Sequence, residues 1–416
     1  MINYNILANN IKRGIVRFCS KLSVGLNKPT IKFINEMIYG ILASQSCYLT
    51  DISRKLNEKI SLKKTVERLS RNLMNFDDTT KLINNYLSTL QSSFDEKTVF
   101  IIDDSDISKP YSKRLEGICK VRDGSTGLLT GGYWTAGVSA LTSKHKQPIP
   151  VYNKVYSSLE DGYTSNNTET IKALAFISNN FSKDNIRAFD RGYDAGIIFD
   201  YLIQREEMFI IRSVGNRHCV HKGKKVLIST LSRQFRGKHL LKFTSKKGLD
   251  VNCKISIVPI TLPSHPNEKL NLVICNGFGK DPLMLITNLT SDDSRLCVTV
   301  TKVYLMRWRI EEYYRFKKQA FGSEKFLVRS LSSIRNLDLF LSIAIGYIGL
   351  LGEKVDDSIE VTEIIHASKR LYGIAKFMFY SISDGLFEIF SMSKTGLRSF
   401  FQKPKPSLQM TLYDCR

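Results

Sequence analysis

Three acidic positions stand in stretches of this chain that could bring carboxylates together. Asp104 stands two residues after the apolar run at 99–102, and Asp190 directly follows the short predicted strand at 186–189. Glu311 comes much later, within a stretch rich in aromatic and cationic residues. Clustered carboxylates bind divalent cations, and two Mg²⁺ ions about 3.5–4 Å apart can activate an attacking hydroxyl and stabilise the leaving oxygen of a phosphodiester. Each acid alone is more typical of a cap or a turn, so the interpretation depends on the three together.

The stretch around Glu311 predicts a helix with one polar face. At roughly 100° per residue, a helix counted from Tyr304 places Arg307 near ~300° and Glu311 near ~340°. On the same scale Lys318 falls near ~320° and Arg315 near ~20°. A face that combines an acid with cations and an aromatic ring is a poor hydrophobic seam, which favours contact with a polar ligand. A surface helix crossed by ion pairs has the same pattern and stays an alternative.

These residues resemble the motifs of insertion-sequence transposases of the insertion-sequence-4 type, which are DDE enzymes with a ribonuclease-H-like catalytic core. The first acidic motif of that family is an apolar strand ending in Asp before Ser or Thr, and the range 101–105 is similar to it. The second is Asp-Arg-Gly-Tyr after a strand, as at 190–193. The third is the Tyr-Arg-Glu-Lys signature, which the chain matches as Tyr304-x2-Arg307-x3-Glu311-x6-Lys318.

The resemblance implies an α/β fold, with a ribonuclease-H-like mixed-sheet catalytic core interrupted by a β-rich insertion and with helical N-terminal and C-terminal regions. It implies that Asp104, Asp190 and Glu311 are the catalytic and metal-binding residues, holding two Mg²⁺ ions for which Mn²⁺ can substitute. Asp104 is preferred to Asp103 because the family's catalytic Asp directly precedes Ser or Thr. Neighbours on a strand face opposite sides, so only one of these two can serve the site, and Asp103 stays the alternative.

The family's activity supplies further expectations. Tyr304, Arg307 and Lys318 would bind the DNA backbone near the cleaved phosphate, and Arg315 shares their predicted helical face. The expected reaction is Mg²⁺-dependent cleavage at transposon ends followed by strand transfer into target DNA. Double-stranded DNA would be the partner, bound by a homodimer in the synaptic complex. Two other functions remain open: a catalytically inactive, transposase-derived repressor, and a ribonuclease-H-like nuclease without strand transfer.

The elements that must position these residues divide the chain into five regions. Apolar residues that recur at three and four positions predict helices before the first strand. Short β-branched and aromatic runs then predict a β-β-β-α-β-α-β order with an antiparallel start and parallel later strands. The predicted regions are a helical DNA-binding region at 1–95, the first part of the core at 96–213, a β-rich insertion at 214–300, the second part of the core with the catalytic helix at 301–352, and helices at 353–416.

Within the core, turn residues separate short sequence runs in which apolar and polar residues alternate or in which all residues are apolar. Because sites in such sheets form at the carboxyl ends of strands, acids that follow two neighbouring strands could meet a third acid from a later helix. The predicted elements are strands at 99–102, 133–141, 148–156, 186–189 and 208–212, and a helix at 194–205.

The composition agrees with a folded chain that binds a polyanion. The 416 residues include 61 Lys and Arg against 39 Asp and Glu, a formal net charge of +22, and 43% are hydrophobic. Such a surplus favours nucleic acid ahead of lipid, although a basic surface kept for solubility agrees equally with the charge alone. Many cations concentrate in the predicted insertion, at Lys222, Lys224, Lys225, Arg233, Arg236, Lys238, Lys242, Lys246 and Lys247.

The remaining sequence features favour an intracellular location. The eight cysteines are scattered without a Cys-x-x-Cys pair, which argues against a zinc ribbon and a disulfide framework. We expect no secretory signal, because the first twenty residues lack a continuous apolar stretch. The longest apolar run, at 339–351, is shorter than the ~20 residues of a membrane-spanning helix and predicts a buried core helix. We therefore expect a cytoplasmic, nucleoid-associated protein without a membrane partner.

Overall fold

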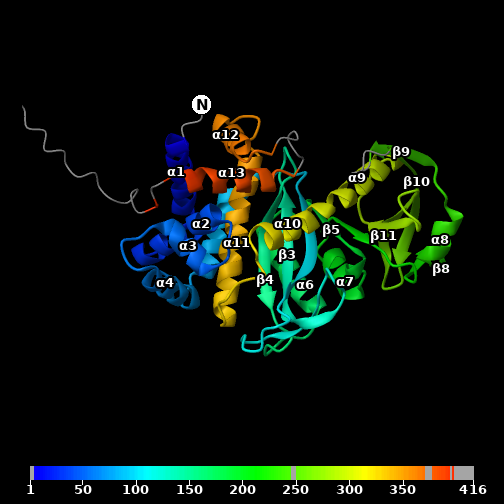
Figure 1. Cartoon of the computed structure of the whole chain (residues 1–416). Coiled ribbons are helices and arrows are strands. Elements are labelled where there is room, and N and C mark those ends of the chain that lie inside the picture. The colour runs from blue at the N-terminus through cyan, green and yellow to red at the C-terminus, as the bar shows by residue number, and fades with distance from the viewer. Residues whose placement is uncertain (1–3, 245–249, 371–376, 394–395, 398–416) are drawn as a thin grey trace, which may run out of the picture.

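The computed structural model describes residues 4–244, 250–370, 377–393 and 396–397. The chain forms a mixed α/β structure with one large sheet through the middle of the molecule. Figure 1 shows the N-terminal helices (blue) at one end and the strands of residues 218–287 (green) at the other. Lys246, Lys247 and much of the predicted C-terminal helical region lie outside the described residues.

Five helices make up the N-terminal region. They are α1 (Tyr4–Leu22), α2 (Lys28–Ser44), α3 (Leu49–Leu56), α4 (Leu62–Met74) and α5 (Thr79–Leu90). Side-chain caps start two of them: Asn27 Oδ1 accepts from Thr30 N at 2.9 Å, and Ser61 Oγ accepts from Lys64 N at 3.5 Å. The apolar faces of these helices join the same core cluster as the strands, so the region packs directly on the rest of the chain.

Five strands form the part of the sheet that carries the first two acidic positions: β1 (Val99–Ser108), β3 (Leu129–Leu141), β4 (Pro148–Tyr156), β5 (Ile186–Phe189) and β6 (Phe209–Arg212). β1 lies between antiparallel β3 and parallel β5; β4 pairs with β3, and β6 runs parallel to β5. Parallel strands need crossover connections, which are supplied by α6 (Asn166–Asn180) and α7 (Gly196–Gln204).

The predicted core strands lie close to their observed positions. The strands at 148–156 and 186–189 have the predicted bounds, and the strand that starts at Val99 continues past 102 to Ser108. A four-residue strand, β2 (Cys119–Arg122), pairs with the start of β3 and is not predicted by the sequence. A pattern of alternating burial over only four residues is too short to predict a strand from the sequence.

The β-rich insertion continues the core sheet. Its elements are β7 (His218–His221), β8 (Lys224–Leu227), α8 (Ile228–Gln234), β9 (His239–Thr244), β10 (Asp250–Leu262), β11 (His265–Asn276) and β12 (Leu283–Thr287). β12 pairs antiparallel with β6, which joins the insertion to the core. Helical structure returns earlier than predicted, in α9 (Asp293–Met306), because the Asp292 side chain caps this helix by accepting from Arg295 N at 3.0 Å.

The stretch treated as one helix over 304–318 is in fact two helices. α9 ends at Met306 and α10 (Trp308–Ala320) follows, with Arg307 at the junction. Arg307 N donates to Tyr304 O at 3.1 Å, a three-residue spacing that tightens the turn. Arg307 keeps right-handed helical backbone angles, φ −51° and ψ −32°, so the chain passes from α9 into α10 through one tightened turn.

The longest helix of the C-terminal half is α11 (Leu331–Gly352). It is the one described helix long and apolar enough to cross a membrane, but 83% of its apolar window is buried inside the structure. It packs on β4, α2 and α4, as expected of the core helix predicted at 339–351. Two further helices, α12 (Ile359–Ala367) and α13 (Phe379–Met392), pack against each other beyond it.

Candidate active site

Strand register brings two acidic positions side by side. The parallel pairing of β1 with β5 ends with Ile102 opposite Phe189. The next residue on each chain segment is an acid, Asp103 after Ile102 and Asp190 after Phe189. Because both strands are largely buried up to this point, they place the two carboxylates together at the end of the parallel pairing.

Arg307 lies between three carboxylates. Its Nη1 is 3.5 Å from Asp103 Oδ2, and its Nη2 is 3.8 Å from Asp190 Oδ2 and 2.7 Å from Glu311 Oε1. The Arg307 side chain is only 7% exposed, whereas the three carboxylates are 21% to 34% exposed. The guanidinium, on the buried side, therefore offsets part of the negative charge of a cluster of acids that opens to solvent.

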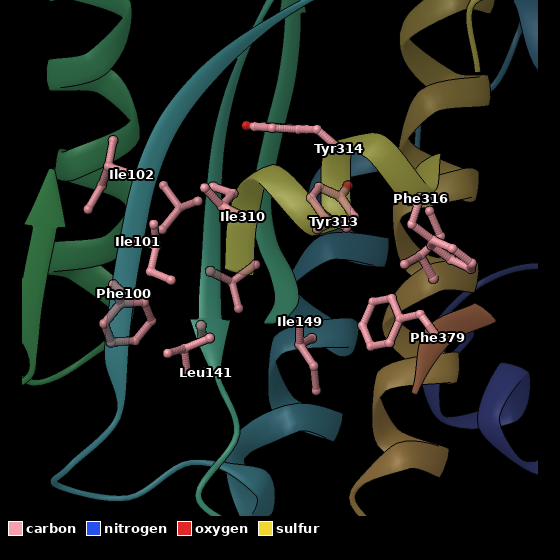
Figure 2. Close-up of a cluster of buried hydrophobic side chains, with 14 of the residues drawn as sticks. Phe100, Ile101, Ile102, Leu141, Ile149, Ile310, Tyr313, Tyr314, Phe316 and Phe379 are labelled. Atoms are coloured by element: carbon pink, nitrogen blue, oxygen red, sulfur yellow. The ribbon is translucent and has the colours of Figure 1, made fainter. Parts of the chain in front are cut away.

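Glu311 reaches this cluster from the first turn of α10. One turn later, the Tyr314 hydroxyl donates to Asp103 O at 2.7 Å. Figure 2 shows Ile310 and Tyr314 on the side of α10 toward the strands, and Phe316 beside Phe379 of α13. The helix that carries Glu311 is thus held on both sides.

Asp104 does not join this cluster, contrary to the expectation that it is the first catalytic acid. Neighbouring strand residues face opposite sides of a sheet, and the side toward Arg307 is that of Asp103. Asp104 lies instead near Tyr193 and near Glu169 of α6. Burial raises the pKa of Asp104 to about 7, a hydrogen bond from Tyr193 opposes the rise, and the charge of Glu169 adds to it. The motif identifies the correct strand, but the geometry favours Asp103.

Two further side chains hold Asp190 in place. The Tyr304 hydroxyl donates to Asp190 Oδ1 at 3.0 Å, and Arg212 Nη1 lies 3.6 Å from the same oxygen. Arg212 also donates to the Tyr304 hydroxyl at 3.5 Å. Arg212 is absent from the predicted site, although a cation directly after the apolar run 209–211, at the same edge of the sheet, is a signal that could have identified it.

The surroundings shift the pKa values of the two aspartates in opposite directions. Burial raises the pKa of Asp103 to about 7, the Arg307 charge opposes this, and the neighbouring carboxylates add to it. Burial also disfavours the charged form of Asp190, yet the pKa of Asp190 is lowered because Arg307, a backbone N–H and Tyr304 together outweigh it. The same charges act on Arg307. Burial alone lowers the pKa of Arg307, but the neighbouring acids raise it overall.

The predicted DNA-binding residues occupy different settings. Tyr304 and Arg307 are each 6% exposed, and their polar atoms contact the carboxylates. Arg315 is exposed, on the side of α10 near Tyr380 of α13 rather than near the acids. Tyr304 and Arg307 therefore share a face toward the acids, as predicted, whereas Arg315 does not lie on that face.

Lys318 ties the last turn of α10 to the end of β1. Its Nζ lies 3.2 Å from Asp106 Oδ1 and 3.0 Å from Glu324 Oε1. Glu324 Oε1 also accepts from Ser108 N at 2.9 Å. These two ion pairs keep α10 aligned along β1, and the contact of Lys318 with DNA stays a prediction.

Asp194, which follows the second motif, holds the insertion against the core. Its carboxylate accepts from Ser213 Oγ at 2.8 Å and from Val214 N at 2.6 Å, and it forms an ion pair with Arg217. Its side chain is 1% exposed. The helix predicted from residue 194 begins later, at Gly196, because a 3₁₀ turn precedes it and Asp194 makes these contacts instead.

A buried ion pair anchors α10 to α11. Lys317 Nζ lies 2.6 Å from Asp338 Oδ1, with side chains 6% and 7% exposed. Asn153 of β4 also donates to Asp338. The pair connects the helix that carries Glu311 to the central helix of the core.

Lys317→Met should destabilise the protein by about 3–5 kcal/mol, because it leaves the Asp338 carboxylate buried without its cation. The double variant Lys317→Met/Asp338→Asn should recover much of this loss, since no buried charge remains. Urea unfolding measures both effects. Lys183→Met is the control: it removes one partner of the exposed Lys183–Glu206 pair and should leave the midpoint unchanged. A wild-type midpoint for Lys317→Met would contradict the anchoring role.

The acids suit a divalent cation, but they do not form a ready-made metal site. Among the described residues, no three His, Cys, Asp or Glu side chains converge closely enough to hold an ion. Asp103, Asp190 and Glu311 converge on Arg307 instead. Carboxylate oxygens are the ligands that Mg²⁺ and Mn²⁺ prefer. Binding of a cation by these acids therefore requires the guanidinium to move aside, and a phosphate is a partner suited to receive it.

Comparisons with known proteins add one structural likeness. No protein-family model matches this chain, and no curated protein matches it. The chain is similar to a solved structure described as the cryo-EM structure of the piggyBac transposase synaptic complex with hairpin DNA. The TM-score is 0.46 and the sequence identity is 9%, over 98% of this chain and 83% of that chain.

Proposed function

We propose that this protein is a transposase that cuts the ends of a DNA element in a Mg²⁺-dependent reaction and joins them to target DNA. The observation that carries the proposal is the meeting of Asp103, Asp190 and Glu311 around Arg307. Three carboxylates from separate elements are the kind of ligand set that metal-dependent phosphodiester chemistry needs. The Tyr-Arg-Glu-Lys spacing supports the insertion-sequence-4 type within the DDE class.

The strand order supports a ribonuclease-H-like catalytic core as part of this proposal. Antiparallel strands β4, β3 and β1 are followed in the sheet by parallel strands β5 and β6. The first acid lies on central strand β1, the second follows its parallel neighbour, and the third comes from a helix after the insertion. This arrangement agrees with one active site assembled from both parts of the core.

In the proposed mechanism the side chains bind and orient the DNA end. When bound by Asp103, Asp190 and Glu311, Mg²⁺ supplies polarisation of the scissile phosphate and activation of the attacking hydroxyl. Arg307, once it leaves the acids, can direct two N–H groups at phosphate oxygens. Tyr304 keeps the Asp190 carboxylate oriented through its hydroxyl.

Strand transfer would follow cleavage in the same site. The oxygen of the freed 3′-hydroxyl forms a bond to a phosphorus of the target strand. The bond from that phosphorus to the target's 3′ oxygen breaks. The attacking hydroxyl gives up a proton and the leaving 3′ oxygen takes one up to become a new 3′-hydroxyl, so no net proton is released. The number of phosphodiester bonds is unchanged, so the step needs no external energy source.

The charge of the chain supports double-stranded DNA as the partner. The formal surplus is +22, and α4 exposes Lys63, Lys64 and Arg71 on the surface opposite its buried leucines. Each phosphate neutralised on a duplex should steepen the dependence of log affinity on log salt by about 0.9. We include in the proposal a DNA-binding role for the N-terminal helices, a homodimer that pairs two ends, and a nucleoid location in the cytoplasm.

A joining assay separates this function from a repressor that only binds DNA and from a nuclease without strand transfer. The full chain is incubated with Mg²⁺, a supercoiled plasmid and a duplex cut in advance at the inverted repeat that flanks the reading frame. We expect the duplex joined covalently to the plasmid, because the cut end supplies the attacking 3′-hydroxyl. Binding of the repeat without any product would support the repressor instead, and cleavage of uncut ends without joining would support the nuclease.

A further inference from the structure

Tyr314 links the helix that carries Glu311 to the backbone of Asp103. It follows Glu311 by one helical turn, is 8% exposed, and donates from its hydroxyl to Asp103 O at 2.7 Å. In Figure 2 its hydroxyl points from α10 toward the strands. This hydrogen bond therefore joins Asp103 to α10, the helix that carries Glu311.

Gly137 makes room for this hydroxyl. It lies on β3 directly opposite Asp103 in the β1–β3 register. A Cβ added at Gly137 would stand 2.1 Å from the Tyr314 hydroxyl oxygen and 3.2 Å from Tyr314 Cζ. Real Cβ atoms essentially never approach another heavy atom within 3.0 Å, so any side chain here would displace Tyr314. The backbone of Gly137 is not in the left-handed region, so the requirement for glycine comes from this close approach.

Besides the packing of Phe316 on Phe379 and the Lys317–Asp338 ion pair to α11, three polar contacts connect α10 and the residue before it to β1. They are the Tyr314 hydrogen bond and one ion pair at each end of the helix. Arg307 contacts Asp103 at the start of the helix, and Lys318 contacts Asp106 at its last turn. When a cation binds to Asp103, Asp190 and Glu311, the Arg307 guanidinium moves from these carboxylates toward a phosphate. Tyr314 then remains the contact from α10 to the backbone of Asp103.

We propose that Tyr314 is a positioning residue that sets the separation between the Glu311 and Asp103 carboxylates. The absence of a side chain at Gly137 leaves the space that the Tyr314 hydroxyl occupies. This inference rests on the proposed metal-dependent function. A shift of α10 by a fraction of an ångström changes how well two ligands on different elements can share a cation. Tyr314 itself touches neither the cation nor the DNA.

The test measures Mn²⁺ binding by electron paramagnetic resonance, with an uncleavable duplex of the inverted repeat bound to the full chain. Tyr314→Phe should weaken Mn²⁺ binding by about tenfold, the range found for side chains that support metal ligands. Cleavage should fall at low Mg²⁺ and approach the wild-type rate at saturating Mg²⁺, with duplex affinity unchanged. Tyr313→Phe is the matched control, because that buried hydroxyl lies 3.3 Å from Ser342 Oγ on α11 and not near β1.

Gly137→Ala should weaken Mn²⁺ binding more than Tyr314→Phe, since the added methyl group displaces the ring and its helix. The double variant Gly137→Ala/Tyr314→Phe should bind Mn²⁺ better than Gly137→Ala alone, because the 2.1 Å clash is removed. A purely structural glycine would show no such rescue. Thermal unfolding and circular dichroism of each variant establish that it is folded.

Two outcomes overturn the inference in distinguishable ways. If Asp103→Asn abolishes Mn²⁺ binding but Tyr314→Phe binds within twofold of wild type, the positioning role is wrong and the proposed function stands. If the wild-type chain with bound duplex takes up no Mn²⁺ at all, the proposed function fails and this inference fails with it.

Discussion

Asp103→Asn should lower the rate of end cleavage by at least about 10³-fold, a loss of several kcal/mol of transition-state stabilisation expected when a metal ligand is removed. Asp104→Asn, one residue further along β1, should cleave at close to the wild-type rate. The difference follows from the register, which places Asp103 beside Asp190 and turns Asp104 toward Glu169. Asp104 lies near Tyr193 and Glu169 rather than near Arg307, so its replacement leaves the three acids around Arg307 in place.

The comparison is made with purified variants on a duplex that carries the inverted repeat, under saturating Mg²⁺. Asp190→Asn and Glu311→Gln serve as positive references and should show losses of the same order as Asp103→Asn. Duplex affinity measured in parallel separates a chemical defect from a binding defect. Full activity of Asp103→Asn together with inactivity of Asp104→Asn would contradict the geometry and restore the assignment made from the motif.

Arg307→Gln should make the protein depend on a cation for stability. Removing the guanidinium leaves Asp103, Asp190 and Glu311 without their shared counter-charge. Loss of one partner from a fully buried pair costs about 3–5 kcal/mol, and the partial exposure of these acids reduces the expected cost to about 2 kcal/mol. Mg²⁺ should restore this loss, so the rise in melting temperature on adding Mg²⁺ should be larger for Arg307→Gln than for wild type.

Arg307→Gln should also cleave at least about 100-fold more slowly, because the charged phosphate contact is lost in a partly desolvated site. Arg309→Gln is the control for both effects. Arg309 Nη1 lies 3.0 Å from Glu312 Oε2, on the same helix but outside the acid cluster. Equal Mg²⁺-dependent shifts for Arg307→Gln, Arg309→Gln and wild type would contradict the role of Arg307 as the counter-charge of the three acids.

The sequence is sufficient to predict the strands and helices that carry the acids. An apolar run buried on both faces defines β1 at 99–102, a short, largely buried segment defines β5 at 186–189, and an acid follows each of them. Glu311 stands out through its spacing from Tyr304 and Lys318. The large mixed sheet and the β-rich insertion follow from the same runs, with boundaries displaced where a cap such as Asp292 starts a helix early.

The choice between Asp103 and Asp104 could not be made from the sequence, because it depends on which face of β1 turns toward α10. That orientation is set by the tertiary contacts of Tyr314 and Arg307 and not by local propensity. The roles of Tyr304 and Lys318 were inaccessible for the same reason. Their partners Asp190, Asp106 and Glu324 lie far away in the chain or beyond a helix end, so these contacts depend on tertiary structure.

The most direct test of the central claim is the position of bound Mn²⁺ in crystals of the full chain with a duplex of the inverted repeat. We predict an anomalous difference peak about 2.0–2.4 Å from carboxylate oxygens of Asp103 and Asp190, with Glu311 as a further ligand and Arg307 turned toward a phosphate. A peak beside Asp104 and Glu169, or the absence of any peak among the three acids at saturating Mn²⁺, would contradict the account.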